Sequence, residues 1–277
     1  MTLTRRQVLD LLSEHGLRPS RALGQNFVVD PNTVRRVARL AGVGTGDRVV
    51  EIGAGLGSLS LALAETGADV TAVEIDRHLL PVLRAVVEPA GVRVVAGDAR
   101  TLDWDRVLEP AEDWKLVANL PYNVATPLVL ELLEHVPAIV RMLVMVQREV
   151  GERLAAHVGD EAYGAVSVKV AYRATASVVG RVPPTVFLPR PKVDSALVLV
   201  ERRSSPAVEA DEGRLFSLVR AGFAQRRKML RRSLAGLVGE EAFAVAAVRP
   251  EARAEELDID AWGRLAAWSS DDGPRPS

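Results

Sequence analysis

The chain has 277 residues, with 35 Lys and Arg against 36 Asp and Glu, and 48% of its residues are hydrophobic. This length predicts roughly two domains, and the composition is that of a globular chain with a full core. The absence of cysteine excludes disulfides, thiol nucleophiles and cysteine-ligated metals, and four scattered histidines disfavour a histidine-rich metal site. No apolar run is long enough for a membrane helix, and the first 20 residues lack the apolar segment of a secretory signal. We therefore expect a cytoplasmic protein that needs no metal and no membrane.

The charges are distributed unevenly along the chain. Residues 1–40 contain seven Arg and three acids, residues 220–232 contain six cations and no acid, and residues 233–277 contain four Arg and nine acids. A single charged stretch is most often the solvated face of a helix. Two basic stretches far apart in a nearly neutral chain favour a polyanionic partner.

Short apolar runs alternate with helical stretches through the first half of the chain. Asp30 and Pro31 predict a helix start, after which apolar residues recur at helical spacing. Five runs then have the composition of strands buried in a parallel sheet, and three stretches between them have helical length. The strands are expected at 47–53, 68–76, 92–97, 114–120 and 140–146, and the helices at 59–67, 79–87 and 125–136. This alternation predicts an α/β fold with an open, doubly wound sheet.

The second half of the chain is expected to finish the sheet and then form a helical domain. After a helix beyond residue 150, strands are predicted within 167–182 and 196–203, around a proline-rich turn, as an antiparallel pair at the sheet edge. A polar break near Ser204 to Pro206 precedes a wholly helical region. We expect a catalytic domain over 1–204, in which residues 1–46 are a helical segment closing the cofactor pocket. A smaller all-α domain follows over 205–277, with a disordered tail from about residue 269.

A glycine-rich turn, Glu51-Ile-Gly-Ala-Gly-Leu-Gly57, separates a predicted strand from a predicted helix. Gly53 and Gly55 allow a tight turn and a close approach to a ligand. Glu74 ends the next strand, where an acid can bind both hydroxyls of a ribose, and Asp98 ends the third, where an adenine amino group would lie. Together these features predict a nucleoside cofactor. The G-x-G-x-G spacing resembles the first motif of S-adenosylmethionine (SAM) methyltransferases, although by itself it favours SAM over NAD only modestly.

The fourth predicted strand ends in Asn119-Leu120-Pro121-Tyr122. Asn119 Oδ1 and the Leu120 carbonyl can accept hydrogen bonds from an exocyclic amine, Pro121 fixes the bend, and Tyr122 offers a ring for a base to stack on. An aryl amine is a poor nucleophile because its lone pair is delocalised, and two acceptors on its hydrogens favour a tetrahedral nitrogen. The turn therefore predicts methyl transfer to an amine, driven by positioning rather than by a strong base. The alternative is an ordinary Asn-Pro turn with Tyr122 as a core aromatic.

These motifs, with three further segments, resemble those of the ribosomal RNA adenine N6-dimethyltransferases over nearly the whole chain. The further segments are Leu23-Gly-Gln-Asn-Phe27, Phe187-Leu-Pro-Arg-Pro-Lys-Val-Asp-Ser195 and Phe223-Ala-Gln-Arg-Arg-Lys-Met-Leu230. The resemblance implies a Rossmann-like SAM-dependent methyltransferase sheet, S-adenosylhomocysteine as product and no metal.

The resemblance also implies site residues. Asn26 and the backbone at Val28, where the family usually has Leu, would line the SAM pocket, and Phe187 would cover the target adenine opposite Tyr122. The expected cofactor-binding residues are Asn26, Val28, Gly53, Gly55, Glu74, Asp98 and Asn119. The expected catalytic residues are Asn119, Leu120, Pro121, Tyr122 and Phe187.

A basic amphipathic helix is expected over residues 216–234. At about 100° per residue, Phe216, Val219, Phe223, Leu230 and Leu234 fall on one stripe. Beside that stripe lie five cations that could contact RNA phosphates without reading sequence. These expected RNA-binding residues are Arg220, Arg227, Lys228, Arg231 and Arg232.

The family has two branches with different substrates. The basic run and the near-neutral charge resemble the branch that dimethylates two adjacent adenosines in a hairpin loop near the 3′ end of 16S rRNA, with a role in small-subunit biogenesis. The resemblance thus implies the small ribosomal subunit as partner, and we expect a monomer. Four alternatives remain: a macrolide-resistance type of large-subunit rRNA methyltransferase, a non-catalytic assembly factor, a nicotinamide-dependent oxidoreductase and a DNA adenine methyltransferase.

Overall fold

The computed structural model describes residues 2–20, 22–109, 112–121 and 124–268, and it divides into two compact units. The first unit comprises Met1–Glu152 and Ser177–Arg202, and the second comprises Arg153–Ala176 and Arg203–Ser277. The expected domain boundary between residues 204 and 205 remains a prediction. The division into compact units is not the same, because it also assigns Arg153–Ala176 to the second unit. Tyr122 and the expected tail from about residue 269 lie outside the described residues.

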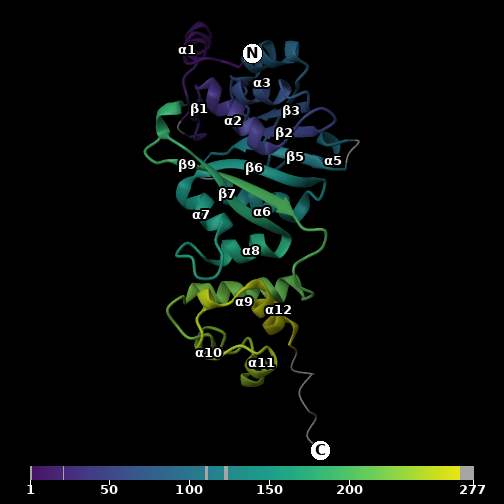
Figure 1. Ribbon diagram of the computed structural model, residues 1–277, viewed down its shortest axis with the longest axis vertical. Coiled ribbons are helices and arrows are strands. Elements are labelled where there is room, and N and C mark those ends of the chain that lie inside the picture. The colour runs from purple at the N-terminus through teal and green to yellow at the C-terminus, as the bar shows by residue number, and fades with distance from the viewer. Residues whose placement is uncertain (1, 21, 110–111, 122–123, 269–277) are drawn as a thin grey trace, which may run out of the picture. The chain divides into compact units, whose positions relative to one another are not determined.

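A seven-stranded sheet forms the centre of the first unit (Figure 1), with the strand order β4-β3-β2-β5-β6-β9-β7. Its strands are β2 (Arg48–Ile52), β3 (Asp69–Glu74), β4 (Arg93–Ala96), β5 (Trp114–Asn119), β6 (Ile139–Gln147), β7 (Ala174–Val182) and β9 (Ser195–Arg202). Neighbours from β4 to β6 run parallel, and β6 and β9 are antiparallel. The predicted open α/β sheet is therefore confirmed, and β9 and β7 complete it at one edge as expected, whereas the antiparallel direction of β7 against β9 stays a prediction. A separate two-stranded sheet pairs β1 (Phe27–Val28) with β8 (Phe187–Leu188).

The helix that begins after Asp30 starts and ends at the residues that the sequence favours. Asp30 caps the first turn of its helix by accepting a hydrogen bond from the Thr33 N–H, Pro31 starts the helix and Gly42 ends it in a left-handed conformation. The helices are α1 (Arg5–Glu14), α2 (Pro31–Ala41), α3 (Ser58–Ala64), α4 (Leu80–Val87), η1 (Glu88–Ala90), α5 (Trp104–Val107), α6 (Ala125–His135), α7 (Arg148–Ala155) and η2 (Pro184–Val186), of which α7 crosses into the second unit.

The side chains of alternate strand residues share one face of the sheet. Val49 and Ala72 are fully buried in a core cluster that also contains residues of α2, α3 and α4. By the same alternation Glu51, Glu74 and Asn119 point to this face, because each lies an even number of residues from a core position on its own strand. Three polar side chains are thereby brought to one side of the sheet, near the carboxyl ends of β2, β3 and β5.

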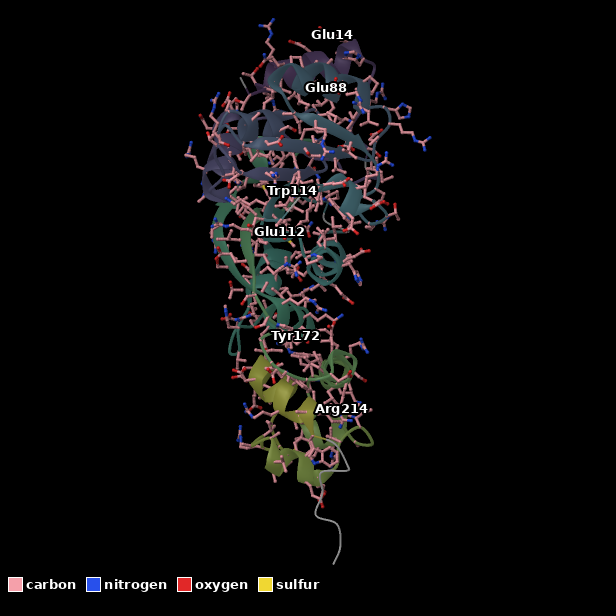
Figure 2. All side chains as sticks on the ribbon, turned by 90° about the vertical axis from the view of Figure 1, so that its right-hand side faces the viewer. Glu14, Glu88, Glu112, Trp114, Tyr172 and Arg214 are labelled. Carbon is pink, nitrogen blue, oxygen red and sulfur yellow. The ribbon has the colours of Figure 1, made fainter. Side chains whose placement is uncertain are left out.

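The prediction of a strand from residue 167 is wrong in its first half, because residues 165–173 form α8 (Ala165–Arg173) and extended structure begins only at Ala174. Val168 and Tyr172 are four residues apart, which places them on one face of a helix as well as on one face of a strand. In the structure both side chains enter the core of the second unit from the helix. Tyr172, labelled in Figure 2, packs edge-on against Phe216 with ring centroids 5.3 Å apart.

In the second unit, every regular element described after residue 204 is helical, as predicted. These elements are α9 (Glu212–Ala224), α10 (Leu230–Ser233), α11 (Glu240–Val245), η3 (Ala254–Glu256) and α12 (Ile259–Ala267). Their core surrounds Trp262, which is fully buried and lies 6.1 Å from the Phe223 ring, measured between ring centroids.

The prediction of one continuous helix over residues 216–234 is wrong, since α9 ends at Ala224 and α10 begins at Leu230. An uninterrupted helix would place like charges four residues apart, as with Arg227 and Arg231, which destabilises a helix. The backbone N–H groups of Leu230 and Arg231 instead donate to the carbonyls of Ala252 and Pro250 at 2.8 and 3.0 Å. Four residues of the expected apolar stripe are nevertheless buried, and Phe223 is half-buried.

Candidate functional site

A cavity with about 780 Å³ of empty space lies at the carboxyl ends of β2, β3 and β5. The strand order runs in opposite directions on either side of β2, from β2 to β3 and from β2 to β5, and such a switch point is where open α/β sheets bind ligands. The cavity is lined by the glycine turn, Glu74, the Asn119–Pro121 turn and a segment that precedes α2. We call this last segment, residues 23–28, the strap.

The glycine turn has backbone angles that favour glycine. Gly53 and Gly55 have φ values of +73° and +60°, in the left-handed region. A Cβ on Gly55 would stand 2.9 Å from Cε1 of Phe27 in the strap. Both glycines are therefore required by local geometry, and the strap packs directly on the turn.

Glu74 is buried at the end of β3, and its carboxylate is held by backbone groups. The Gly55 N–H donates to Oε2 at 2.7 Å, and the N–H groups of Ile75 and Asp76 donate to Oε1 at 2.9 and 2.8 Å. Burial nevertheless raises the pKa of Glu74, with the three N–H donors acting in the opposite direction. Each oxygen keeps further acceptor capacity, so the carboxylate can also bind hydroxyl groups in the cavity.

Glu51 is the second buried acid of the cavity, and sequence reasoning assigned it no role. It is 2% exposed, and its Oε2 accepts a hydrogen bond from the Ser60 hydroxyl of α3. Burial raises the pKa of Glu51 to about 8, with the Ser60 bond opposing and the nearby Glu74 adding to the shift. Glu51 therefore carries a proton at neutral pH. Its position before the glycine turn was visible in the sequence, but its neutrality was not.

Asn119 ends β5 at the cavity wall, and the chain after it is anchored to the sheet. The Asn119 Nδ2 donates to the backbone carbonyl of Asn26 in the strap at 2.9 Å. No described residue donates to Asn119 Oδ1, so this oxygen is available to a ligand. The Leu120 N–H donates to the Met145 carbonyl at 3.0 Å, while Leu120 and Pro121 line the cavity.

Asp98 lines a neighbouring cavity with about 800 Å³ of empty space, to which Leu23, Gly53, Ile75 and Pro121 also contribute. Its carboxylate accepts hydrogen bonds from Arg100 Nη2 at 2.7 Å and from Arg100 Nε at 3.2 Å. These bonds lower the pKa of Asp98. Sequence reasoning did not single out Arg100, although a cation two residues after the acid was the signal available.

Of two further predicted site residues, Val28 lines the first cavity and Phe187 lines neither cavity. Val28 is 7% exposed and lines the first cavity. It lies opposite Phe187 in the register of the two-stranded sheet. Phe187 is 1% exposed, lies in the core cluster and is not among the residues that line either cavity. Its predicted contact with a base stays a prediction, as does that of Tyr122, which lies outside the described residues.

The predicted RNA-binding cations lie in the second unit, and all five are exposed. Arg231 forms an ion pair with Glu251 at 3.5 Å. Among the described residues, none forms an ion pair or a side-chain hydrogen bond with Arg220, Arg227, Lys228 or Arg232. The neighbouring Arg226, in contrast, binds Glu255 at 2.6 Å and the Glu161 carbonyl at 3.1 Å, so it has a structural partner.

Two kinds of feature are missing from the part of the chain that the structure describes. No three His, Asp or Glu side chains there are grouped so that they could hold a metal ion. No helix there combines the length and apolar character needed to cross a membrane.

The comparisons with known proteins point to one family. The model of a family described as ribosomal RNA adenine dimethylase matches residues 17–271. Ribosomal RNA small subunit methyltransferase A of Kineococcus radiotolerans is 48% identical over 275 residues, which cover 96% of this chain and 91% of that protein. The protein of the same description from Thermobifida fusca is also 48% identical over 275 residues, covering 95% of each chain.

Two solved structures share the fold over most of the chain. The crystal structure of 23S rRNA methyltransferase ErmE superimposes with a TM-score of 0.68 at 28% identity, covering 86% of this chain and 97% of that one. A dimethyladenosine transferase from Plasmodium falciparum superimposes with a TM-score of 0.71 at 24% identity, covering 85% and 94% of the two chains, and supports the fold alone. The predicted Rossmann-like methyltransferase fold is confirmed, and the chain belongs to the ribosomal RNA adenine dimethylase family.

Proposed function

We propose that the chain transfers methyl groups from SAM to N6 of two adjacent adenosines in a hairpin loop near the 3′ end of 16S rRNA, during small-subunit biogenesis. The observation that carries this proposal is the arrangement of Asn119. Its Nδ2 is engaged by the Asn26 carbonyl at 2.9 Å, which leaves Oδ1 as an acceptor at a cavity whose other wall is the glycine turn.

The cavity fits SAM on structural grounds. Gly53 and Gly55 present backbone without a Cβ, and Glu74 offers oxygens already oriented by three N–H donors. Asn26 and the backbone at Val28 would line the cofactor pocket beside them. Asp98 would receive the adenine amino group in the adjoining cavity, provided that it exchanges or shares its bond with Arg100. When bound, SAM supplies an activated methyl group on a sulfonium.

The residues of the chain then prepare the target amine. Asn119 Oδ1 and the Leu120 carbonyl accept the two N6 hydrogens and favour a tetrahedral nitrogen whose lone pair faces the cavity. With SAM bound, this nitrogen would take the methyl group from the sulfonium, which would leave S-adenosylhomocysteine, and the amine proton would pass to an acceptor or to water. No strong base is required, because most of the acceleration comes from alignment, worth about 7–11 kcal/mol. For a second methylation, the pocket must accept one N–H and one methyl group.

Four of the predicted RNA-binding cations, which form no ion pair with any described residue, would contact RNA phosphates. Exposed Arg and Lys without an acidic partner bind the backbone of RNA and release counterions, without reading its sequence. Arg220, Arg227, Lys228 and Arg232 have this property. Arg231 would have to give up Glu251 first, so its contribution should be smaller.

The small subunit is favoured over the alternatives by the relatives. Relatives named for the small subunit are 44–48% identical, against 28% for the 23S rRNA methyltransferase of similar fold. An oxidoreductase or a DNA methyltransferase would leave the family match unexplained. A non-catalytic assembly factor would need none of the site geometry around Asn119. We further propose that the chain acts in the cytoplasm, as a monomer.

The decisive experiment incubates the protein with labelled SAM and undermethylated small subunits, then maps the modified nucleotides. We expect label on two adjacent adenosines of the 3′ hairpin. Label on large-subunit rRNA only, or none, would overturn the proposal. Asn119→Ala should reduce turnover at least a hundredfold while S-adenosylhomocysteine still binds in calorimetry, and unchanged turnover would remove Asn119 from the mechanism.

The RNA contact has a test of its own. Arg227→Glu combined with Lys228→Glu should weaken binding to small subunits at least tenfold, reduce its salt dependence and leave cofactor affinity unchanged. Arg48→Glu with Arg106→Glu, at two exposed arginines outside both basic stretches, makes the same change in net charge and serves as the control. Equal weakening by both pairs would mean that total charge matters and these positions do not.

A further inference from the structure

We propose that the strap orients the catalytic amide: the Asn26 carbonyl determines which way the Asn119 side chain faces, and Gln25 holds that carbonyl in place by binding Asp76. Gln25 is thereby assigned as a positioning residue. This inference rests on the role of Asn119 in the proposed function and adds to it a reason why the loop before α2 has to be closed for methyl transfer.

The amide of Asn119 has two ends with opposite hydrogen-bonding character. With Nδ2 toward the Asn26 carbonyl, at 2.9 Å, a donor meets an acceptor. If the amide turned over, Oδ1 would face that carbonyl, and two acceptors would repel each other. The outward end would then be Nδ2, which cannot accept a hydrogen from the target amine. One main-chain oxygen in the strap therefore selects the productive orientation.

The Asn26 carbonyl can select an orientation only if the strap is held firmly. Gln25 uses both ends of its side chain for this purpose. Its Nε2 donates to Asp76 Oδ2 at 2.8 Å, and its Oε1 accepts from the Ser20 N–H at 2.7 Å. Asp76 is itself fixed, because its Oδ1 accepts from the His78 N–H at 3.0 Å. The strap is thus tied to the segment that follows Glu74 at the end of β3.

A second contact ties the strap to the cofactor side of the cavity. The Phe27 ring lies where any side chain at Gly55 would have to be, so it packs on the backbone of the glycine turn. Residues 25, 26 and 27 therefore contact, one after another, the β3 end, the catalytic turn and the glycine turn. Displacement of the strap should disturb cofactor binding and the orientation of Asn119 together.

The test uses a swap of donor and acceptor. Gln25→Glu keeps the acceptor for Ser20 but sets a carboxylate oxygen against Asp76, so the link should break. Adding Asp76→Asn restores a donor–acceptor pair with reversed polarity and preserves the oxygen that faces His78. Gln25→Met, which has similar length and no donor, covers the case in which the charged variant does not fold. Gln7→Glu, in the N-terminal capping box of α1, is the matched control.

Two readouts separate this inference from the proposed function. At saturating SAM, Gln25→Glu should lower kcat for small subunits at least tenfold and raise KM for SAM, with kcat in the double variant within threefold of wild type. Independently of activity, the side-chain NH₂ signal of Asn119, assigned by its loss in Asn119→Asp, should shift in ¹H–¹⁵N NMR spectra of Gln25→Glu and Gln25→Met and return in the double variant.

The outcomes are distinct. An Asn119 signal that is the same in wild type, Gln25→Glu and Gln25→Met would overturn the inference, as would a double variant no better than Gln25→Glu. A wild-type protein that leaves small subunits unmethylated would refute the proposed function instead, and the NMR comparison would still decide the role of Gln25.

Discussion

Glu51→Gln should make the stability of the first unit less dependent on pH. Glu51 is 2% exposed beneath the glycine turn, and burial raises its pKa from an ordinary value of 4.5 to about 8. Between these two values the folded protein holds a proton that the unfolded chain releases. The stabilisation from this proton is fully present below pH 4.5 and is lost as the pH rises through about 8. The amide that replaces the carboxyl group in the variant is neutral at every pH and can still accept a hydrogen bond from Ser60.

The size of the effect follows from proton linkage. While the folded state holds one more proton than the unfolded state, the free energy of unfolding falls by about 1.4 kcal/mol per pH unit. From pH 6 to pH 7.5, wild type should therefore lose about 2 kcal/mol more than Glu51→Gln. Glu51 stays mostly protonated over this pH range, so Glu74 faces a neutral neighbour in both proteins, and the difference between the two curves reports chiefly on Glu51.

The measurement is urea denaturation of both proteins at several pH values, followed by tryptophan fluorescence. Trp114, on the strand next to that of Glu51, is 3% exposed and should report unfolding of this unit (Figure 2). Curves of unfolding free energy against pH that run parallel for the two proteins would refute the reasoning, because they would mean that Glu51 titrates alike in the folded and unfolded states.

Two further predictions concern glycines. Gly222→Ala should destabilise the second unit by about 1–3 kcal/mol, against the usual helix preference for alanine, because the new Cβ would lie 2.6 Å from Cη2 of Trp262. Gly213→Ala in the same helix has room and should be neutral or stabilising by up to about 1 kcal/mol; equal thermal shifts for both would contradict this account. Gly55→Ala should cost about 1–2 kcal/mol in backbone strain, add a clash with Phe27, and weaken S-adenosylhomocysteine binding at least tenfold in calorimetry. An unchanged affinity would show that the turn tolerates a Cβ.

The second half of the chain shows where local sequence patterns fail. Val168, Val170 and Tyr172 alternate as in a strand, but Val168 and Tyr172 are also one helical turn apart. The core of the second unit selects the helix. Likewise, the apolar stripe from Phe216 to Leu234 predicted burial well but not the break after Ala224. The break depends on carbonyls of residues 250 and 252, which are distant in sequence.

The sequence by itself determined the order of the main strands and helices from β2 to β6, the glycine turn, and the placement of Glu74, Asp98 and Asn119 at or just after strand ends. These features depend on hydrophobic periodicity and local turn chemistry, which act over a few residues. Only the tertiary structure decided that Asn119 binds the Asn26 carbonyl, that Gln25 binds Asp76 and that Glu51 is neutral. Each of these depends on burial or on the meeting of separate segments, and no pattern within one segment encodes such a meeting.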